Sequence, residues 1–254
     1  FQACQEGIRS FRRQLHLPNR CMKAPIVLAV DTSDLETAKR WVEATHESVS
    51  VFKLGLEFFL NFGQAGVAAI QDVTDSDIFL DLKLHDIPHT VSGAATAIKG
   101  LAPRFLTVHA SGGKEMVAAA VAALPGTSIT AVTILTSLSE EDLFEIGYAN
   151  NALESAVALA KLSVNAGAKA IVCSPLEIAS IRSAIGPEIE IITPGVRPQA
   201  DANSDDQKRT MTPVDAINAG ASLLVIGRPI TSAWKDGAAA MSARARLIAD
   251  EILK

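Results

Sequence analysis

Two charged residues at the end of an apolar run are the strongest chemical signal in this sequence. Asp81 and Lys83 follow the strand-forming run at 78–80. Because successive side chains of a strand point to opposite faces, both share a face with Phe79, and the leucines at 80, 82 and 84 share the other. A buried ion is costly unless it is paired, and these two side chains can pair with each other. The pattern indicates either a functional charge cluster or a structural ion pair at a strand end.

Two further charges lie in neighbouring strand-like runs. Asp31 ends the first run, where a turn residue or helix cap is the alternative, and Lys53 interrupts the second. A lysine inside so short an apolar run needs a partner for its charge, unless it extends to the strand end. With Asp81 and Lys83, these residues predict an alternating Asp–Lys–Asp–Lys array where neighbouring strands end. In the barrel fold predicted below, this array surrounds the mouth. Such an array neutralises itself and can bind a hydrogen-bonding substrate.

Asp86 differs from this array in its predicted orientation. It falls on the opposite parity from Asp81 and Lys83, and Pro88 stops the strand just after it. We therefore expect Asp86 in a loop, from which it can reach elsewhere, including into another subunit.

Two segments nearer the C-terminus predict a phosphate site. Gly227 and Arg228 follow the last strand-like run; glycine lets a backbone N–H approach an anion, and arginine can bind it through two hydrogen bonds. Barrels often bind phosphate after their seventh and eighth strands. Arg197 opens a polar loop at 198–213 that includes Gln207. A loop of this length predicts a lid over an anion, with a solvated excursion as the alternative.

The elements that must position these residues alternate regularly between strands and helices. Apolar, β-branched runs predict eight strands, at 26–31, 51–55, 78–85, 105–109, 129–135, 170–174, 190–193 and 223–227. Helices are expected between them, at about 33–47 (opened by a capping box of Ser33 and Glu36), 57–71, 91–99, 113–123, 139–146, 151–166 and 175–185, with a last helix at 234–253. Eight βα units predict an α/β fold, a single-domain (β/α)8 TIM barrel. A doubly wound sheet is the alternative, but no strand is followed by Gly-x-Gly-x-x-Gly.

Composition restricts the remaining classes. The 254 residues are 48% hydrophobic with a net charge of -5, which argues against nucleic-acid binding. No apolar run approaches the roughly 20 residues needed to span a bilayer, so no membrane association is expected. Cys4, Cys21 and Cys173 have neither metal spacing nor a disulfide framework, and a reducing cytoplasm is the expected compartment. We expect Cys173 to be a small core hydrophobe.

The first residues differ in character from the rest of the chain. Residues 1–21 carry no signal-peptide pattern, and Met22 stands directly before the first strand. We interpret 1–21 as a non-core extension, expression-derived or native, and 22–254 as the catalytic barrel. A short amphipathic helix that docks on the barrel is the alternative for 1–21.

Taken together, the motifs resemble those of one family, the bacterial orotidine 5′-monophosphate decarboxylases. The pattern Asp-x-Lys-x-x-Asp-Ile-Pro-x-Thr at 81–90 is similar to the signature of that family. The likeness extends in order over about 24–250, through motifs at 30–31, 52–55, 108–113, 132–137, 193–198, 206–209, 211–213 and 225–229.

The resemblance implies a cofactor-independent conversion of orotidine 5′-monophosphate to uridine 5′-monophosphate (UMP) and CO2, the last step of UMP biosynthesis. Lys83 would protonate C6 of the pyrimidine, with Asp81 and Lys53 completing the array and Asp86 entering it from the partner subunit. The implied substrate-binding residues are Asp31, Lys53, Asp81, Thr90 of the partner subunit, Thr136, Pro194, Arg197, Gln207, Gly227 and Arg228. The resemblance also implies a homodimer with shared sites, and no metal or organic cofactor.

Two other functions remain open at this point. A sugar-phosphate decarboxylase or synthase on a similar barrel shares Asp-x-Lys-x-x-Asp but binds Mg2+. Those relatives carry a glutamate at the end of the second strand, whereas this chain has Lys53, which would repel a divalent ion. A non-catalytic phosphate-binding barrel is the other alternative, although such a protein would be expected to lack a member of the charge array.

Overall fold

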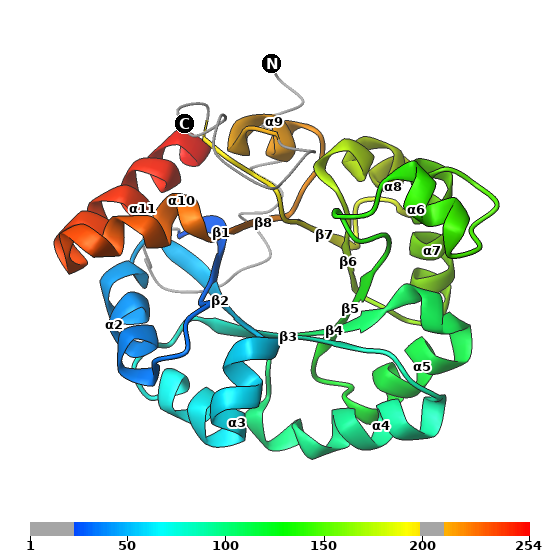
Figure 1. The fold of residues 1–254 in the computed structure, drawn as a ribbon, viewed down its shortest axis with the longest axis horizontal. Helices are drawn as coiled ribbons and strands as arrows, with labels where there is room; N and C mark the ends of the chain where they lie inside the picture. The colour runs from blue at the N-terminus through cyan, green and yellow to red at the C-terminus, as the bar shows by residue number, and fades with distance from the viewer. Residues whose placement is uncertain (1–22, 199–210) are drawn as a thin grey trace.

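The predicted barrel is confirmed in a computed structural model that describes residues 23–198 and 211–254 (Figure 1). Eight parallel strands pair in chain order, and β1 pairs with β8 to close the ring. The strands are β1 (Ala24–Ala29), β2 (Val49–Gly55), β3 (Asp77–Leu84), β4 (Phe105–His109), β5 (Ser128–Val132), β6 (Ala170–Val172), β7 (Glu190–Thr193) and β8 (Leu223–Ile226). Parallel strands end at the same face, so the residues that follow them converge there.

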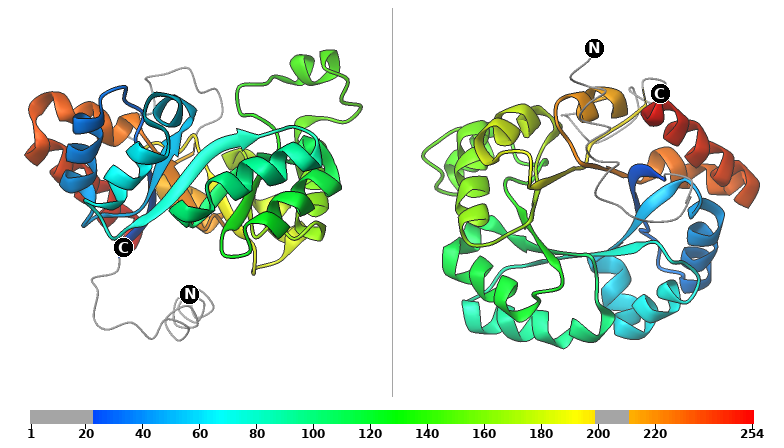
Figure 2. Two further views of the ribbon diagram at one scale, coloured as in Figure 1. Left: turned by 90° about the horizontal axis from the view of Figure 1, so that it is seen from below. Right: turned by 180° about the vertical axis from the view of Figure 1, so that it is seen from behind.

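Helices surround the strands as an outer ring (Figure 1). They are α2 (Leu35–Thr45), α3 (Leu56–Gln71), α4 (Pro88–Ala97), α5 (Gly113–Ala123), α6 (Glu140–Glu145), α7 (Ala152–Asn165), α8 (Ile178–Ile185), α9 (Pro213–Asn218), α10 (Arg228–Thr231) and α11 (Ala238–Leu253). The green segment that carries α6 projects from the end of the barrel where the strands end (Figure 2). Among the residues described, no helix is both long and apolar enough to cross a membrane.

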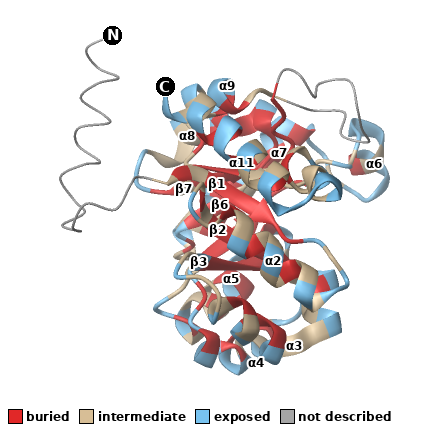
Figure 3. Cartoon of the chain, turned by 90° about the vertical axis from the view of Figure 1, so that its left-hand side faces the viewer, coloured by how far each residue is buried: buried red, intermediate tan, exposed pale blue. Residues whose placement is uncertain are grey.

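Two apolar layers hold the barrel together. The outer layer lies between strands and helices and includes Leu80 and Leu82, as the alternation of β3 predicts. The inner layer fills the barrel with Val27, Val51, Phe79, Phe105, Ala170, Ile192 and Leu223. Figure 3 shows the strands as the most deeply buried part of the chain. Burial of each large apolar side chain stabilises the folded state by about 1.5–3 kcal/mol. The interior of the barrel is therefore a packed core rather than a pore, and it supports the end where the strands finish.

A network of ion pairs lies at the end of the barrel where the strands begin. Arg104, just before β4, donates to Asp77 at the start of β3 and to Glu190 at the start of β7, each at 2.7 Å. Its guanidinium also lies 4.7 Å from the ring centroid of Phe105. Burial lowers the pKa of Arg104, but the charge of Glu190 and the hydrogen bond with Asp77 outweigh it, and the pKa is raised overall. This network ties β3, β4 and β7 together at the end away from the predicted site.

Several predicted boundaries are wrong. The first helix is capped by Asp34, whose carboxylate accepts from the Thr37 N–H at 2.7 Å, so the capping box of Ser33 and Glu36 is not formed. The fifth strand ends at Val132 rather than at 135. These errors have one cause, because local sequence marks that an element ends but does not fix which neighbouring residue ends it.

The helices after β3, β7 and β8 also differ from expectation. Helix α4 begins at Pro88 rather than 91, because proline suits the first position of a helix. Helix α9 was not predicted, and it supplies the element between β7 and β8. The last helix begins at Ala238 rather than 234, because Gly237 has a φ of 96° that interrupts the helical path. The predicted extension at 1–21 and Gln207, predicted as part of a lid, lie outside the described residues.

Candidate active site

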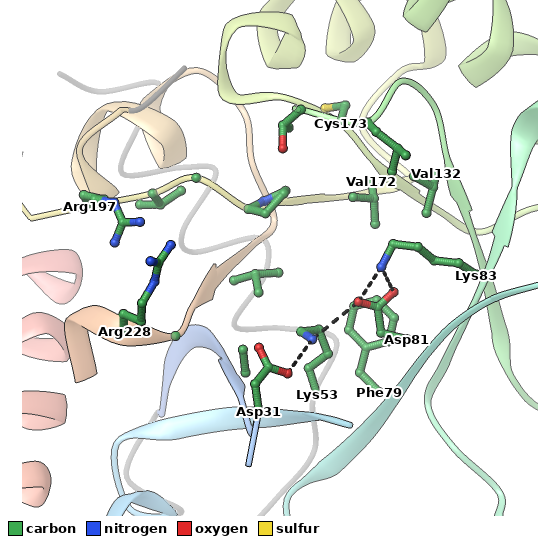
Figure 4. A pocket seen from close by; sticks show the side chains of 18 of the residues that line it. Asp31, Lys53, Phe79, Asp81, Lys83, Val132, Val172, Cys173, Arg197 and Arg228 are labelled. Atoms are coloured by element: carbon green, nitrogen blue, oxygen red, sulfur yellow. Dashed lines mark hydrogen bonds and ion pairs between the residues drawn. The ribbon is translucent and has the colours of Figure 1, made fainter. Parts of the chain in front are cut away.

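A cavity of about 330 Å³ opens where the strands end (Figure 4). Nine of the predicted site residues line it: Asp31, Lys53, Asp81, Lys83, Thr136, Pro194, Arg197, Gly227 and Arg228. They come from the ends of β1, β2, β3, β7 and β8 and from the segment after β5. The convergence follows from the parallel topology, which brings residues far apart in sequence to one mouth.

The four predicted charges form a continuous chain across β1, β2 and β3. Lys53 Nζ lies 3.4 Å from an oxygen of Asp31 and 3.4 Å from an oxygen of Asp81. Lys83 Nζ donates to both carboxylate oxygens of Asp81 at 2.8 Å. Lys53 and Asp81 are each only 9% exposed, so their charges depend on this pairing. Strand register explains the contact, because Asp81 of β3 pairs with Gly55 of β2, two residues beyond Lys53.

Asp81 is an anion held in place by cations. Burial acts to raise its pKa, but the charges of Lys53 and Lys83, together with hydrogen bonds from Lys83 and Thr107, outweigh burial and hold the pKa below its ordinary value. Asp81 therefore stays ionised throughout the neutral pH range. The alternating array has no net charge, and it offers both donors and acceptors to a ligand.

The backbone of Lys83 is unusual. Its φ is 48°, a left-handed conformation that is uncommon for residues other than glycine. The β3–β4 register also shifts here, since Leu80 pairs with Leu106 but Leu84 pairs with Val108. Simple alternation predicted the correct face for Lys83, but it gave no sign of this distortion.

Two arginines face the charge array from across the cavity. Arg228 follows Gly227 at the end of β8, and Arg197 follows β7 and is only 8% exposed. In Figure 4 their guanidinium groups turn toward one another, on the opposite side of the pocket from Lys83. A ligand that spans the cavity can therefore meet a cationic end and a paired-charge end.

Apolar residues that were not predicted as site residues form the wall between these ends. They are Phe79, Val132, Ile134, Val172 and Cys173. Cys173 is 1% exposed, which confirms it as a core residue, and burial raises the pKa of its thiol well above the ordinary value. The apolar residues at the ends of the fifth and sixth strands could have predicted this wall from the sequence. Such an apolar wall can pack against the flat ring of a ligand.

His109, at the end of β4, lies close enough to Lys83 for their charges to interact, but it does not line the cavity. Its ring centroid lies 5.3 Å from that of His85. Burial lowers the pKa of His109, and so does the repulsion that its charged form would meet from His85 and Lys83, so its ring is neutral near pH 7. Within the described ranges, no three His, Cys, Asp or Glu side chains gather closely enough to hold a metal ion.

Asp86 and Thr90 are not brought into this cavity. Both are exposed, and Asp86 accepts a hydrogen bond from the Ile87 backbone N–H at 2.7 Å. They lie in the segment from the end of β3 into the first turn of α4. Their predicted role in a second subunit remains a prediction.

The fold and cavity together define a (β/α)8-barrel enzyme class whose mouth combines a buried Asp–Lys array with facing arginines. The family model described as "Orotidine 5'-phosphate decarboxylase / HUMPS family" matches residues 24–243, and the chain belongs to this family.

Individual relatives agree with this assignment. The chain is 54% identical to the orotidine 5'-phosphate decarboxylase of Thermobifida fusca (strain YX) over 226 residues, 89% of this chain and 97% of that relative. It is 45% identical to the enzyme of the same name from Moorella thermoacetica (strain ATCC 39073 / JCM 9320) over 240 residues, 91% of this chain and 92% of the relative. The crystal structure of orotidine 5'-phosphate decarboxylase from Lactobacillus acidophilus superposes with a TM-score of 0.78 at 32% identity, covering 91% of this chain and all of that one.

Proposed function

We propose that this protein decarboxylates orotidine 5′-monophosphate to UMP and CO2, the last step of UMP biosynthesis. The observation that carries the proposal is the contact of Lys83 Nζ with both oxygens of the buried Asp81, at 2.8 Å, in the cavity of a chain from this family. The named relatives are 45% and 54% identical over most of their length and are orotidine 5'-phosphate decarboxylases.

Lys83 is the proposed acid. When the bond between C6 and the carboxylate breaks, CO2 leaves and the electron pair stays on C6, in the plane of the ring. No pyridoxal or thiamin is expected to take up that pair, so a fixed ammonium must stabilise it. Lys83 then donates a proton to C6 and recovers one from water. Asp81 would hold the ammonium in place, as its 2.8 Å contacts with Lys83 suggest, and would repel the departing carboxylate.

The other end of the cavity is the proposed phosphate site. Arg197, Gly227 and Arg228 would bind the phosphate, with Gln207 joining them from the lid, while Asp31 and Lys53 would bind ribose hydroxyls. Thr136 and Pro194 would contact the base from the segments after β5 and β7. Binding energy from the phosphate, remote from C6, can then be used to orient the pyrimidine against Lys83.

The proposal includes a cytoplasmic homodimer with shared sites and no cofactor. The exposed segment of Asp86 and Thr90 also contains Ile87, which is 64% exposed, and burial of this apolar side chain against a second copy would stabilise a dimer. Lys53 argues against a divalent metal, because its ammonium occupies the position where the metal-binding relatives carry a glutamate.

Turnover of orotidine 5′-monophosphate, followed by loss of its ultraviolet absorbance, tests the function. We expect activity that is unchanged by EDTA. Activity that is abolished by EDTA and restored by Mg2+ would move the protein to the sugar-phosphate branch. UMP binding without any turnover would instead identify a non-catalytic phosphate-binding barrel.

A further inference from the structure

Thr107 connects the two central residues of the site without lining the cavity. It lies in the middle of β4 and is fully buried. Its hydroxyl donates to a carboxylate oxygen of Asp81 at 3.0 Å. The same hydroxyl accepts from the backbone N–H of Lys83 at 2.8 Å. One side chain thus bonds both the carboxylate and the main chain that carries the ammonium.

The position of Thr107 coincides with the distortion of β3. Between Leu80 and Leu84 the strand advances four residues, while its partner β4 advances only from Leu106 to Val108. The N–H of Lys83 bonds the Thr107 hydroxyl at this point. A left-handed backbone at a residue other than glycine is strained and persists only where its surroundings hold it. The Thr107 hydroxyl is one such restraint on Lys83.

We propose that Thr107 is a positioning residue that fixes the Lys83 ammonium and the Asp81 carboxylate relative to each other for the decarboxylation. The inference rests on the proposed function. Thr107 acts through these two residues, because it hydrogen-bonds both of them and does not line the cavity. Its hydrogen bond also favours the ionised form of Asp81. Without the hydroxyl, Asp81 keeps Lys53 and Lys83 as partners but loses the contact that sets its orientation.

Thr130 provides a matched control. It pairs with Thr107 in the register of β4 and β5 and is also fully buried. Its hydroxyl donates to the backbone carbonyl of Ser128, 3.0 Å away on its own strand, and not to the site. Thr→Val at either position keeps the side-chain shape and removes one buried hydroxyl. A general effect of losing such a hydroxyl would therefore appear in both variants.

The experiment compares Thr107→Val, Thr107→Ser and Thr130→Val in steady-state kinetics with orotidine 5′-monophosphate and in UMP binding. We expect Thr107→Val to lower kcat by about 10- to 100-fold, as small misplacements of catalytic groups do. The KM and the Kd of UMP should change by less than about threefold, since the phosphate contacts are intact. Thr107→Ser should recover most of kcat, and Thr130→Val should stay within about twofold of the unsubstituted protein.

A kcat of Thr107→Val within about threefold of the unsubstituted protein, or equal losses in both valine variants, would overturn the inference. If Thr107→Val does not fold, Thr107→Ala replaces it, with the same serine rescue required. A second readout does not depend on turnover: in NMR titration of the ligand-free protein, the Asp81 carboxyl should titrate at higher pH in Thr107→Val. If the unsubstituted protein shows no decarboxylation, the proposed function fails, whereas an unchanged Asp81 titration would contradict the role of Thr107 by itself.

Discussion

Replacing Asp81 by asparagine should destabilise the protein strongly at neutral pH. The substitution keeps the shape of the side chain but removes the negative charge between Lys53 and Lys83. The net charge of the array changes from zero to positive, and Lys53, which is 9% exposed, keeps only the exposed Asp31 as a counter-ion among the described residues. Two cations then face each other across a neutral amide in a partly desolvated cavity.

The distances set the size of the effect. At an effective dielectric constant of about 20, unit charges 2.8 Å apart attract by about 6 kcal/mol, and charges 3.4 Å apart by about 5 kcal/mol. Desolvation offsets much of this attraction, and losing one partner of a buried pair typically costs about 3–5 kcal/mol. Because the Lys83 side chain is 31% exposed, we expect the lower end, about 3 kcal/mol.

The loss should depend on pH in a definite direction. Since the pKa of folded Asp81 lies below its ordinary value of 3.8, its ionised form contributes stability that is fully present above pH 3.8. That contribution is lost as the pH falls through the lowered pKa. The difference between the unsubstituted protein and Asp81→Asn should therefore be complete at pH 7 and shrink below about pH 4.

Urea unfolding followed by circular dichroism at pH 7 and at pH 3.5 measures both effects. With a slope of about 2–3 kcal/mol/M, Asp81→Asn should lower the midpoint by about 1–1.5 M at pH 7. Asp75→Asn is the control, because the Asp75 side chain is 56% exposed and its pair with Lys23 spans 3.6 Å. A midpoint for Asp81→Asn as high as that of the control, or a difference that grows on acidification, would refute the reasoning.

Three further predictions concern phosphate binding, subunit sharing and the acid. Arg228→Ala should weaken UMP binding by about tenfold or more but barely change uridine binding, because only UMP carries the phosphate. If calorimetry shows the same loss of affinity for UMP and for uridine, the phosphate binds elsewhere. Mixing inactive Lys83→Ala with inactive Asp86→Ala protein, under conditions that exchange subunits, should restore turnover, because one shared site in each mixed dimer carries neither lesion. Mixed dimers that form and stay inactive would put Asp86 in the site of its own subunit. Lys83→Arg should be about as inactive as Lys83→Ala, because a guanidinium keeps the positive charge but gives up a proton far less readily than an ammonium. A near-normal kcat for Lys83→Arg would exclude Lys83 as the acid.

Much of the site could be predicted because it depends on strand alternation and strand order. Alternation placed Phe79 and Asp81 inside the barrel, and the count of strands placed Gly227 and Arg228 at the mouth. Both rules act within a single element or along the chain order. They need no knowledge of how particular side chains meet.

The parts that were missed depend on contacts between elements. The role of Thr107 requires the register shift between β3 and β4, which no local pattern in either strand reveals. Helix α9 has only six residues and follows a polar loop, so it has no sustained periodicity. The cap of the first helix was misplaced because Thr32, Ser33 and Asp34 are all good capping residues, and only the backbone path selects Asp34.

Turnover of orotidine 5′-monophosphate in heavy water by the unsubstituted protein and by Lys83→Ala tests the central claim most directly. The unsubstituted protein should place one deuterium at C6 of UMP. Lys83→Ala should lose at least about 1,000-fold in kcat while still binding UMP, since Lys83 lies across the cavity from the proposed phosphate site. A kcat for Lys83→Ala close to that of the unsubstituted protein would contradict the assignment of Lys83 as the acid that protonates C6.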